Sequence, residues 1–140
     1  MSKLADHVRA WLAGEVKLAP ITELLAIRPV DIEEGLARLE MPVDARLHNA
    51  MGTVHGGIFC DLADVAIGTA LATVTEDGES FATLQLQMSY FQPVRAGRLT
   101  ATARLLRRGR TTAHLECEID DEAGEPVAKA TSVLAIRRQE

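Results

Sequence analysis

The clearest pattern in this chain is the alternation of apolar and polar residues through its second half. In three segments apolar side chains recur at every second position, as expected for half-buried β-strands: residues 81–91, 98–105 and 112–119. Residues 127–137 predict one further strand. Short connections at Gly109-Arg110 and at residues 122–125 separate the last three segments. We therefore expect these three to form an antiparallel meander.

The middle of the chain follows a helical period instead. Between Ile58 and Thr73, apolar residues recur at three- and four-residue intervals on one side, and the opposite side is also largely apolar. A helix that is apolar all round is typical of a buried helix. A polar turn over residues 75–79 ends it.

The first third of the chain is patterned more loosely. Residues 2–19 place Leu4, Val8, Trp11 and Leu12 on one stripe and predict an amphipathic helix that Pro20 ends or kinks. Residues 21–27 fit a short helical turn or an extended piece equally well. Residues 30–40 predict a strand, and residues 41–47 a second short extended piece.

Together these segments predict an α+β architecture, in which one long buried helix is wrapped by a curved antiparallel sheet. The length of 140 residues suits one main domain. We expect residues 1–28 to form an N-terminal helical extension packed on a domain of residues 29–140.

Composition and charge exclude several classes of protein. A net charge of −5 and an aromatic content of 4% disfavour nucleic-acid binding, which needs a basic face or stacking platforms. No apolar run approaches the roughly 20 residues that span a bilayer, so we expect no membrane association. Charged residues interrupt the N-terminus, and Cys60 and Cys117 fit buried free thiols, so a cytoplasmic location is expected.

The candidate chemistry lies at the start of the predicted helix. Asp64 is a carboxylate among apolar neighbours, so it is either a working group or a core residue satisfied by a backbone group. The loop before the helix ends in His55-Gly56-Gly57, where backbone N–H groups at a helix N-terminus stabilise developing negative charge. A base and an oxyanion site in one segment indicate acyl transfer. The spacing of His48, His55 and Asp64 does not suit a metal site, and we expect no metal and no cofactor.

The segment His48-Asn49-x-x-Gly52-x-x-His55-Gly56-Gly57, followed by Asp64, resembles the signature of hotdog-fold acyl-CoA thioesterases of the PaaI-like (phenylacetate-pathway) group. The likeness spans about residues 30–137 and includes Tyr90-Phe91-Gln92-Pro93-Val94. It implies hydrolysis of an acyl-CoA thioester, with CoA as part of the substrate. It also implies a homo-oligomer, a dimer or a homotetramer, with active sites at the dimer interface.

Roles can then be assigned to individual residues. The Gly56 N–H would bind the oxyanion, because glycine permits close backbone approach. Asp64 would act as general base or as nucleophile, and the sequence leaves both routes open. The resemblance gives Asn49 to the attacking water or the thioester, and Thr83 to orienting the nucleophile; His55 would brace the loop or lie near the thioester. Gly57 and the arginines Arg95, Arg107, Arg108 and Arg110 are candidates for contacts with CoA.

Other interpretations stay open at this point. The chain could be a thioester hydratase or dehydratase of the same fold, or a non-catalytic acyl-CoA-binding module. Asp61 fits a first-turn residue that interacts with the helix dipole. The arginines at 104–110 also fit a solvated hairpin tip. The acyl group is not specified: small, aromatic and medium-chain groups are all compatible with the sequence.

Overall fold

The computed structural model describes residues 2–139; residues 1 and 140, the outer ends of the two expected segments, lie outside the described part. It consists of one six-stranded sheet, one long helix and two short N-terminal helices. In chain order the elements are α1 (Lys3–Leu12), α2 (Pro20–Leu24), β1 (Arg28–Glu33), β2 (Leu36–Val43), a 3-10 turn (Ala45–Leu47), α3 (Gly56–Ala72), β3 (Glu79–Tyr90), β4 (Gly97–Arg108), β5 (Thr112–Asp120) and β6 (Pro126–Arg138).

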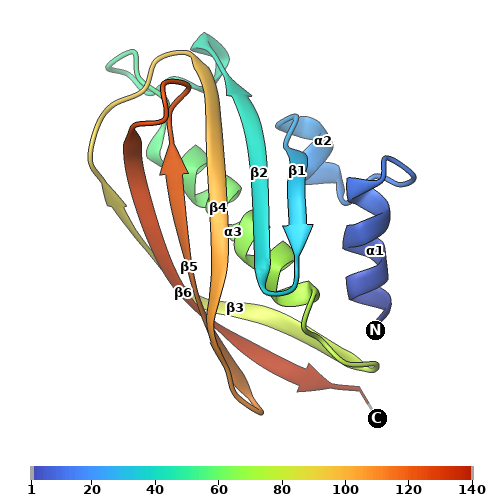
Figure 1. The fold of residues 1–140 in the computed structure, drawn as a ribbon. Helices are drawn as coiled ribbons and strands as arrows, with labels where there is room; N and C mark the ends of the chain where they lie inside the picture. Colours follow the sequence, from blue (N-terminus) through green and yellow to red (C-terminus); the bar gives the residue numbers. More distant parts are fainter. Residues whose placement is uncertain (1, 140) are drawn as a thin grey trace.

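The sheet is antiparallel throughout and has the strand order β1-β2-β4-β5-β6-β3. Figure 1 shows it curving around α3, with α1 and α2 beside β1. The expected meander is confirmed as β4-β5-β6. β3 precedes these strands in the chain but pairs with β6, so it forms one edge of the sheet. One side of this 12-residue strand therefore has no strand partner within the described chain.

The core lies between the sheet and α3. Alternation puts every second residue of β2, β4 and β5 on the helix side, where small alanines let the helix approach closely. The fully buried members of this layer include Ala37, Leu39, Met41, Leu99, Ala101, Ala103, Leu115, Cys117 and Ile119 from these strands, and Leu62, Ala63, Ala66, Ile67, Ala70 and Leu71 from the helix. The α+β arrangement with a curved sheet is as the sequence predicts.

One expectation about α3 is wrong: the helix is not buried all round. Gly57, Asp61 and Asp64, spaced at helical intervals, are exposed along one stripe. The sheet of a single chain covers only the opposite side of the helix. Apolar residues flank this stripe on both sides, and this pattern alone suggested complete burial. The same pattern is also compatible with a helix surface that contacts a ligand or a second chain.

The N-terminal segment also differs from its prediction. The expected helix over residues 2–19 is confined to Lys3–Leu12, and Gly14 leaves it with a left-handed φ of +77°. Pro20 does not end a helix but begins α2, because its fixed φ and missing N–H suit the first helical position. α1 nevertheless packs on β1 and α3, with Val8 and Trp11 buried.

The prediction of one strand over residues 30–40 is wrong as well. The chain forms a hairpin there, with β1 and β2 joined at Glu34-Gly35. Gly35 has a φ of +72°, which a residue with a side chain rarely adopts, and an added Cβ would lie 3.3 Å from Leu105 Cβ. The expected extended piece after Met41 ends at Val43, where the Asp44 side chain caps the 3-10 turn.

Candidate active site

Asp64 lies two turns into α3, on the exposed stripe of the helix. Its Oδ1 accepts a hydrogen bond of 2.8 Å from Thr83 Oγ1 of β3. The structure thus brings together two residues that the sequence analysis associated with the nucleophile. The neighbouring carboxyl, Asp61, is also exposed, and partial burial together with the charge of Asp64 raises its pKa.

The start of α3 is capped by a histidine. His55 Nδ1 accepts a hydrogen bond of 3.0 Å from Gly57 N–H, and the His55 carbonyl accepts from Ile58 N–H. The ring nitrogen at Nδ1 is therefore unprotonated, and the Gly57 N–H is used within the chain. Within residues 2–139, the Gly56 N–H has no acceptor. It is the free donor at the positive end of the helix.

Tyr90 holds the next peptide group in place. Its hydroxyl, at the end of β3, donates to the Gly56 carbonyl at 2.7 Å, and its ring packs edge-on against Phe59 with centroids 5.6 Å apart. An added Cβ on Gly56 would lie 3.0 Å from this hydroxyl, so a larger residue there would require the tyrosine to shift. Partial burial, with the Cys60 thiol 3.5 Å away, raises the pKa of Tyr90 to about 12 and keeps it a donor.

The loop that leads into α3 is braced by its own side chains. Asn49 Oδ1 accepts from the N–H groups of Met51 and Thr53, and its amide donates to Thr53 Oγ1 at 3.0 Å. His48 Nε2 lies 2.7 Å from the Arg95 carbonyl. Among residues 2–139, the hydrogen bonds of the Asn49 side chain are to its own loop, as in a residue that shapes the loop.

The free donor and the acid of one chain are separated. Gly56 and Asp64 are eight residues apart on one helix, which corresponds to about 12 Å along its axis. A reacting carbonyl must lie about 3 Å from both its oxyanion donor and its nucleophile. One chain cannot supply both groups to the same thioester.

The four candidate arginines lie at opposite ends of the molecule. Arg95 follows β3 and is close to the loop before α3. Arg107 and Arg110 are exposed near the tip of the β4–β5 hairpin. Arg108 is used within the chain: it donates to the Val74 carbonyl, beyond the C-terminal end of α3, and pairs with Glu79, whose side chain is fully buried. The structure therefore makes Arg108 a structural residue and does not support its assignment to CoA.

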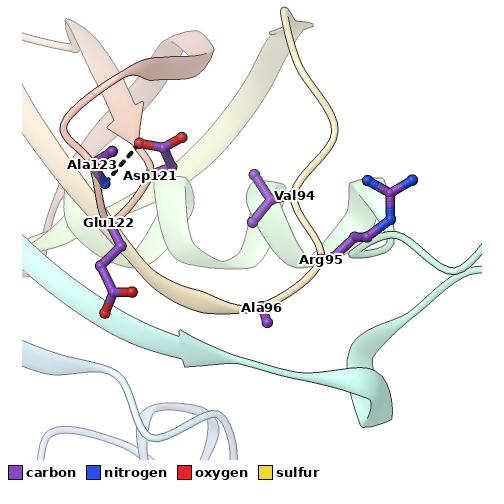
Figure 2. A pocket seen from close by; sticks show the side chains of 6 residues that line it. All are labelled: Val94, Arg95, Ala96, Asp121, Glu122 and Ala123. Carbon is purple, nitrogen blue, oxygen red and sulfur yellow. Dashed lines mark hydrogen bonds between the residues drawn. The ribbon is translucent and has the colours of Figure 1, made fainter.

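A shallow depression of about 520 Å³ lies beside Arg95 (Figure 2). Asp121 and Glu122 line its other side, and Asp121 Oδ1 accepts from the Ala123 and Glu125 N–H groups of the β5–β6 turn. In Figure 2 the Arg95 guanidinium points away from both carboxylates. The depression is a feature of the turn, and its negative charge disfavours the phosphates of CoA.

Among residues 2–139, no three His, Cys, Asp or Glu side chains are grouped so that they could hold a metal ion. In the same part of the chain, no helix has the length and apolar character needed to cross a membrane.

The sequence analysis missed the structural role of Tyr90. Tyr90 is the single tyrosine of the chain, and alternation puts it on the same side as Leu86 and Met88. A lone tyrosine on the apolar side of a strand indicates that its hydroxyl has a hydrogen-bond partner. Its target, a peptide group at the start of a helix far away in sequence, is visible only in three dimensions.

A long helix wrapped by a curved sheet, with an acid on the helix and a glycine cap before it, defines a hotdog-fold protein. The Thioesterase superfamily matches residues 51–128, which is more than half of the chain. The chain belongs to this superfamily, and it is an enzyme of the thioesterase class.

Individual relatives agree with this assignment. The chain is 36% identical over 93 residues to the proofreading thioesterase EntH of Klebsiella pneumoniae, covering 66% of this chain and 68% of that protein. It is 27% identical over 119 residues to the 1,4-dihydroxy-2-naphthoyl-CoA hydrolase of Listeria monocytogenes, covering 85% and 97%.

Solved structures agree on the fold. A phenylacetic acid degradation-related protein from Ralstonia eutropha has a TM-score of 0.84 and 27% identity, covering 92% of this chain and 98% of its own. The PaaI protein of Escherichia coli has a TM-score of 0.83 at 24% identity, covering 99% and 97%. These matches confirm the PaaI-like resemblance found in the sequence.

Proposed function

We propose that the protein hydrolyses an acyl-CoA thioester to the free acid and CoA, and that the active site is completed by a second copy of the chain. The observation that carries this proposal is that one helix presents two groups: a Gly56 N–H with no acceptor among residues 2–139, and the exposed carboxylate of Asp64. Both are groups that acyl transfer requires, and both lie on the side of α3 that the sheet leaves open.

The Gly56 N–H serves as the oxyanion donor. Tyr90 and His55 fix the two ends of the following peptide group, so the first turn of the helix is rigid before substrate arrives. A preorganised donor stabilises the charge on the carbonyl oxygen without reorganisation, and such donors contribute about 10² to 10³ in rate.

Asp64 supplies the attacking step. As a general base, it takes a proton from water while the water oxygen attacks the carbonyl carbon, and the C–S bond breaks to release CoA thiolate, which is then protonated. As a nucleophile, its Oδ attacks the same carbon and the C–S bond breaks to release CoA thiolate, which is then protonated; water hydrolyses the resulting mixed anhydride to the free acid and restores the Asp64 carboxylate. The Thr83 hydroxyl orients the carboxylate in either route, because it holds Oδ1 and leaves Oδ2 for the reaction.

The second copy is required by the distance between Gly56 and Asp64. An antiparallel pairing of two β3 edges would extend the sheet across two chains and set the open stripes of two α3 helices against each other. The Asp64 of one chain then faces the Gly56 of the other. Leu84 on this edge strand supports the pairing: its side chain is 60% exposed in a single chain, and a second copy would cover this apolar surface. Two such dimers would form the homotetramer that the resemblance implies.

CoA is held as part of the substrate, and no separate cofactor is part of the mechanism. Arg95, on the same side as the Gly56 loop, is the arginine of one chain best placed for the CoA phosphates. Arg107 and Arg110 lie near the tip of the β4–β5 hairpin, and from there they could contact CoA only at that end of the molecule. The two free thiols, Cys60 and Cys117, are typical of a reducing compartment and support a cytoplasmic location.

Release of free thiol from a panel of acyl-CoA esters tests the activity. Asp64→Asn should lower kcat by about 10³-fold, because the attacking group is lost. Asp61→Asn is the matched control: it removes a carboxylate from the same exposed stripe, one turn earlier, and should keep kcat within about threefold of the original enzyme. Equal losses in the two variants would refute the assignment. Tight acyl-CoA binding with no thiol release would indicate a binding module instead.

A further inference from the structure

Cys60 lies one helical turn after Gly56, on a half-buried flank of α3. Its sulfur is 3.5 Å from the Tyr90 hydroxyl oxygen, which donates a hydrogen bond of 2.7 Å to the Gly56 carbonyl. Residues four positions apart on a helix lie on the same face, so the thiol and the carbonyl reach the same side chain of β3. The thiol, the hydroxyl and the carbonyl therefore form one continuous chain of polar contacts.

The directions of the hydrogen bonds in this chain follow from the hydrogens available. The Gly56 carbonyl can only accept, and the Tyr90 hydroxyl donates its single hydrogen to that carbonyl. The hydroxyl oxygen then has lone pairs but no further hydrogen, so the Cys60 thiol is the donor in the third contact. If the Tyr90 hydrogen turned to the sulfur instead, two oxygens with no hydrogen between them would lie 2.7 Å apart and repel each other.

We propose that Cys60 is a positioning residue for the thioesterase reaction: its S–H group keeps the Tyr90 hydroxyl directed at the Gly56 carbonyl and thereby fixes the peptide group next to the oxyanion donor. The inference rests on the proposed function and adds a residue that acts through Tyr90 rather than on the substrate. Glycine has the widest backbone freedom of all residues, so a peptide group between Gly56 and Gly57 stays in place only where its neighbours hold it.

The surroundings of Tyr90 make a weak donor effective. The Phe59 ring packs edge-on against the Tyr90 ring and limits its movement. An S–H group is a weak donor, but hydrogen bonds that are linked in a chain polarise one another, and they do so more strongly in a partly buried setting. We therefore expect the thiol to contribute about threefold to kcat, less than the Tyr90 hydroxyl that it supports.

Cys60→Ala and Cys60→Ser separate the hydrogen bond from side-chain packing. Cys60→Ala removes the donor and should lower kcat by about threefold with KM unchanged, because substrate still binds but its oxyanion meets a less fixed N–H. Cys60→Ser keeps a donor on the same Cβ and should retain kcat within about 1.5-fold of the original enzyme. Hydrolysis is followed by the loss of thioester absorbance, because reagents for free CoA also react with protein thiols. Equal losses in the two variants would overturn the inference.

A double-mutant cycle tests whether the effect passes through Tyr90. In a Tyr90→Phe background the thiol has no oxygen to hold, so Cys60→Ala should cause no further loss of kcat. A merely structural role of Cys60 would lower kcat by the same factor in both backgrounds. Losses that multiply in this way would show that Cys60 acts independently of Tyr90, and they would overturn the inference.

Infrared spectroscopy of the thiols gives a readout that does not depend on turnover. The S–H stretching band lies in a region free of other protein bands and moves to lower frequency when the S–H group donates a hydrogen bond. The chain has two thiols, Cys60 and Cys117, so Cys60→Ser removes one band and assigns both. Tyr90→Phe should move the Cys60 band to higher frequency. The Cys117 band should stay in place, since that thiol donates to the Glu118 carbonyl at 3.8 Å. A Cys60 band unchanged in Tyr90→Phe would overturn the inference.

These readouts distinguish failure of the inference from failure of the proposed function. If no acyl-CoA ester loses its thioester absorbance, the proposed hydrolysis is refuted and the kinetic role of Cys60 with it, whereas the infrared bands still decide whether the hydrogen-bond chain exists. If esters are hydrolysed and Cys60→Ala is as active as the original enzyme, the hydrolysis stands and the positioning role alone is refuted.

Discussion

The Tyr90 hydroxyl donates a 2.7 Å hydrogen bond to the Gly56 carbonyl and so links the end of β3 to the first turn of α3. His55 Nδ1 holds the N–H of the same peptide group, contributed by Gly57. The peptide group that follows the proposed oxyanion donor is therefore fixed at both ends. The orientation of the donor depends on a side chain that does not itself touch the substrate.

Tyr90→Phe should lower kcat by about fivefold to tenfold with little change in KM. The variant removes one hydrogen bond worth about 1 kcal/mol and frees the first turn of the helix to move. Steady-state kinetics with a good acyl-CoA ester would measure the effect. Ser89→Ala, which removes a hydroxyl from the preceding, exposed position of β3, is the control and should behave like the original enzyme.

Gly56→Ala should lower kcat by about 10²-fold, because the new Cβ would lie 3.0 Å from the Tyr90 hydroxyl and must displace it or the helix start. The same substitution should cost less in a Tyr90→Phe background, where that oxygen is absent. A double-mutant cycle measures this coupling. Additive losses would mean that the close approach of the two residues does not govern the donor.

Arg108→Ala should destabilise the protein by about 3 kcal/mol, since it leaves the Glu79 carboxylate buried with one partner fewer. The KM for acyl-CoA should not change, because Arg108 is used at the end of α3 away from Gly56. Arg107→Ala, an exposed neighbour, should change stability by less than about 0.5 kcal/mol. Denaturant unfolding of both variants checks the comparison, and a raised KM in Arg108→Ala would restore its assignment to CoA.

Glu79 should make stability dependent on acid pH. Its burial alone would raise its pKa, but the Glu76 N–H and the Arg108 and Arg138 guanidinium groups outweigh burial and lower the pKa below 4.5. A carboxyl with a lowered folded pKa stabilises the protein above its unfolded value, and that contribution is lost as the pH falls through the folded value. The free energy of unfolding, measured between about pH 3 and pH 6, should fall less steeply toward acid pH in Glu79→Gln than in the original protein.

Leu84→Glu should leave the protein monomeric and inactive, because it places a charge on the β3 edge proposed to pair with a second copy. Leu106→Glu is a close control: Leu84 is 60% and Leu106 57% exposed, and both lie at irregular positions of their strands. Sedimentation velocity separates the two outcomes. An active, monomeric Leu84→Glu variant would exclude a shared active site.

Much of the fold could be predicted from the sequence because local periodicity and burial agree in the second half. The alternation in residues 98–105 and 112–119 has one face toward α3 and one toward solvent, so each strand can be read directly. The place of β3 could not be predicted, because its pairing with β6 depends on contacts distant in sequence. The β1–β2 hairpin was missed because a single glycine, Gly35, forms its turn within an apparently continuous strand.

The candidate site was predictable in its residue types but not in its geometry. Asp64 and Gly56 were identified from their setting at the start of an apolar helix. The distance between them, the use of the Gly57 N–H by His55 and the engagement of Arg108 with Glu79 are properties of the folded chain. The exposure of one stripe of α3 could not be predicted, because the apolar residues on both sides of that stripe suggested complete burial of the helix.

The position of α1 and α2 has a consequence for how such an enzyme changes over evolutionary time. The segment before β1 contributes no strand to the sheet and no reacting group, yet it borders the space next to the acid. Substitutions in the first two dozen positions can therefore change the surface beside Asp64 without altering any strand of the sheet. The environment of the acid and the framework that holds it can thus diverge independently.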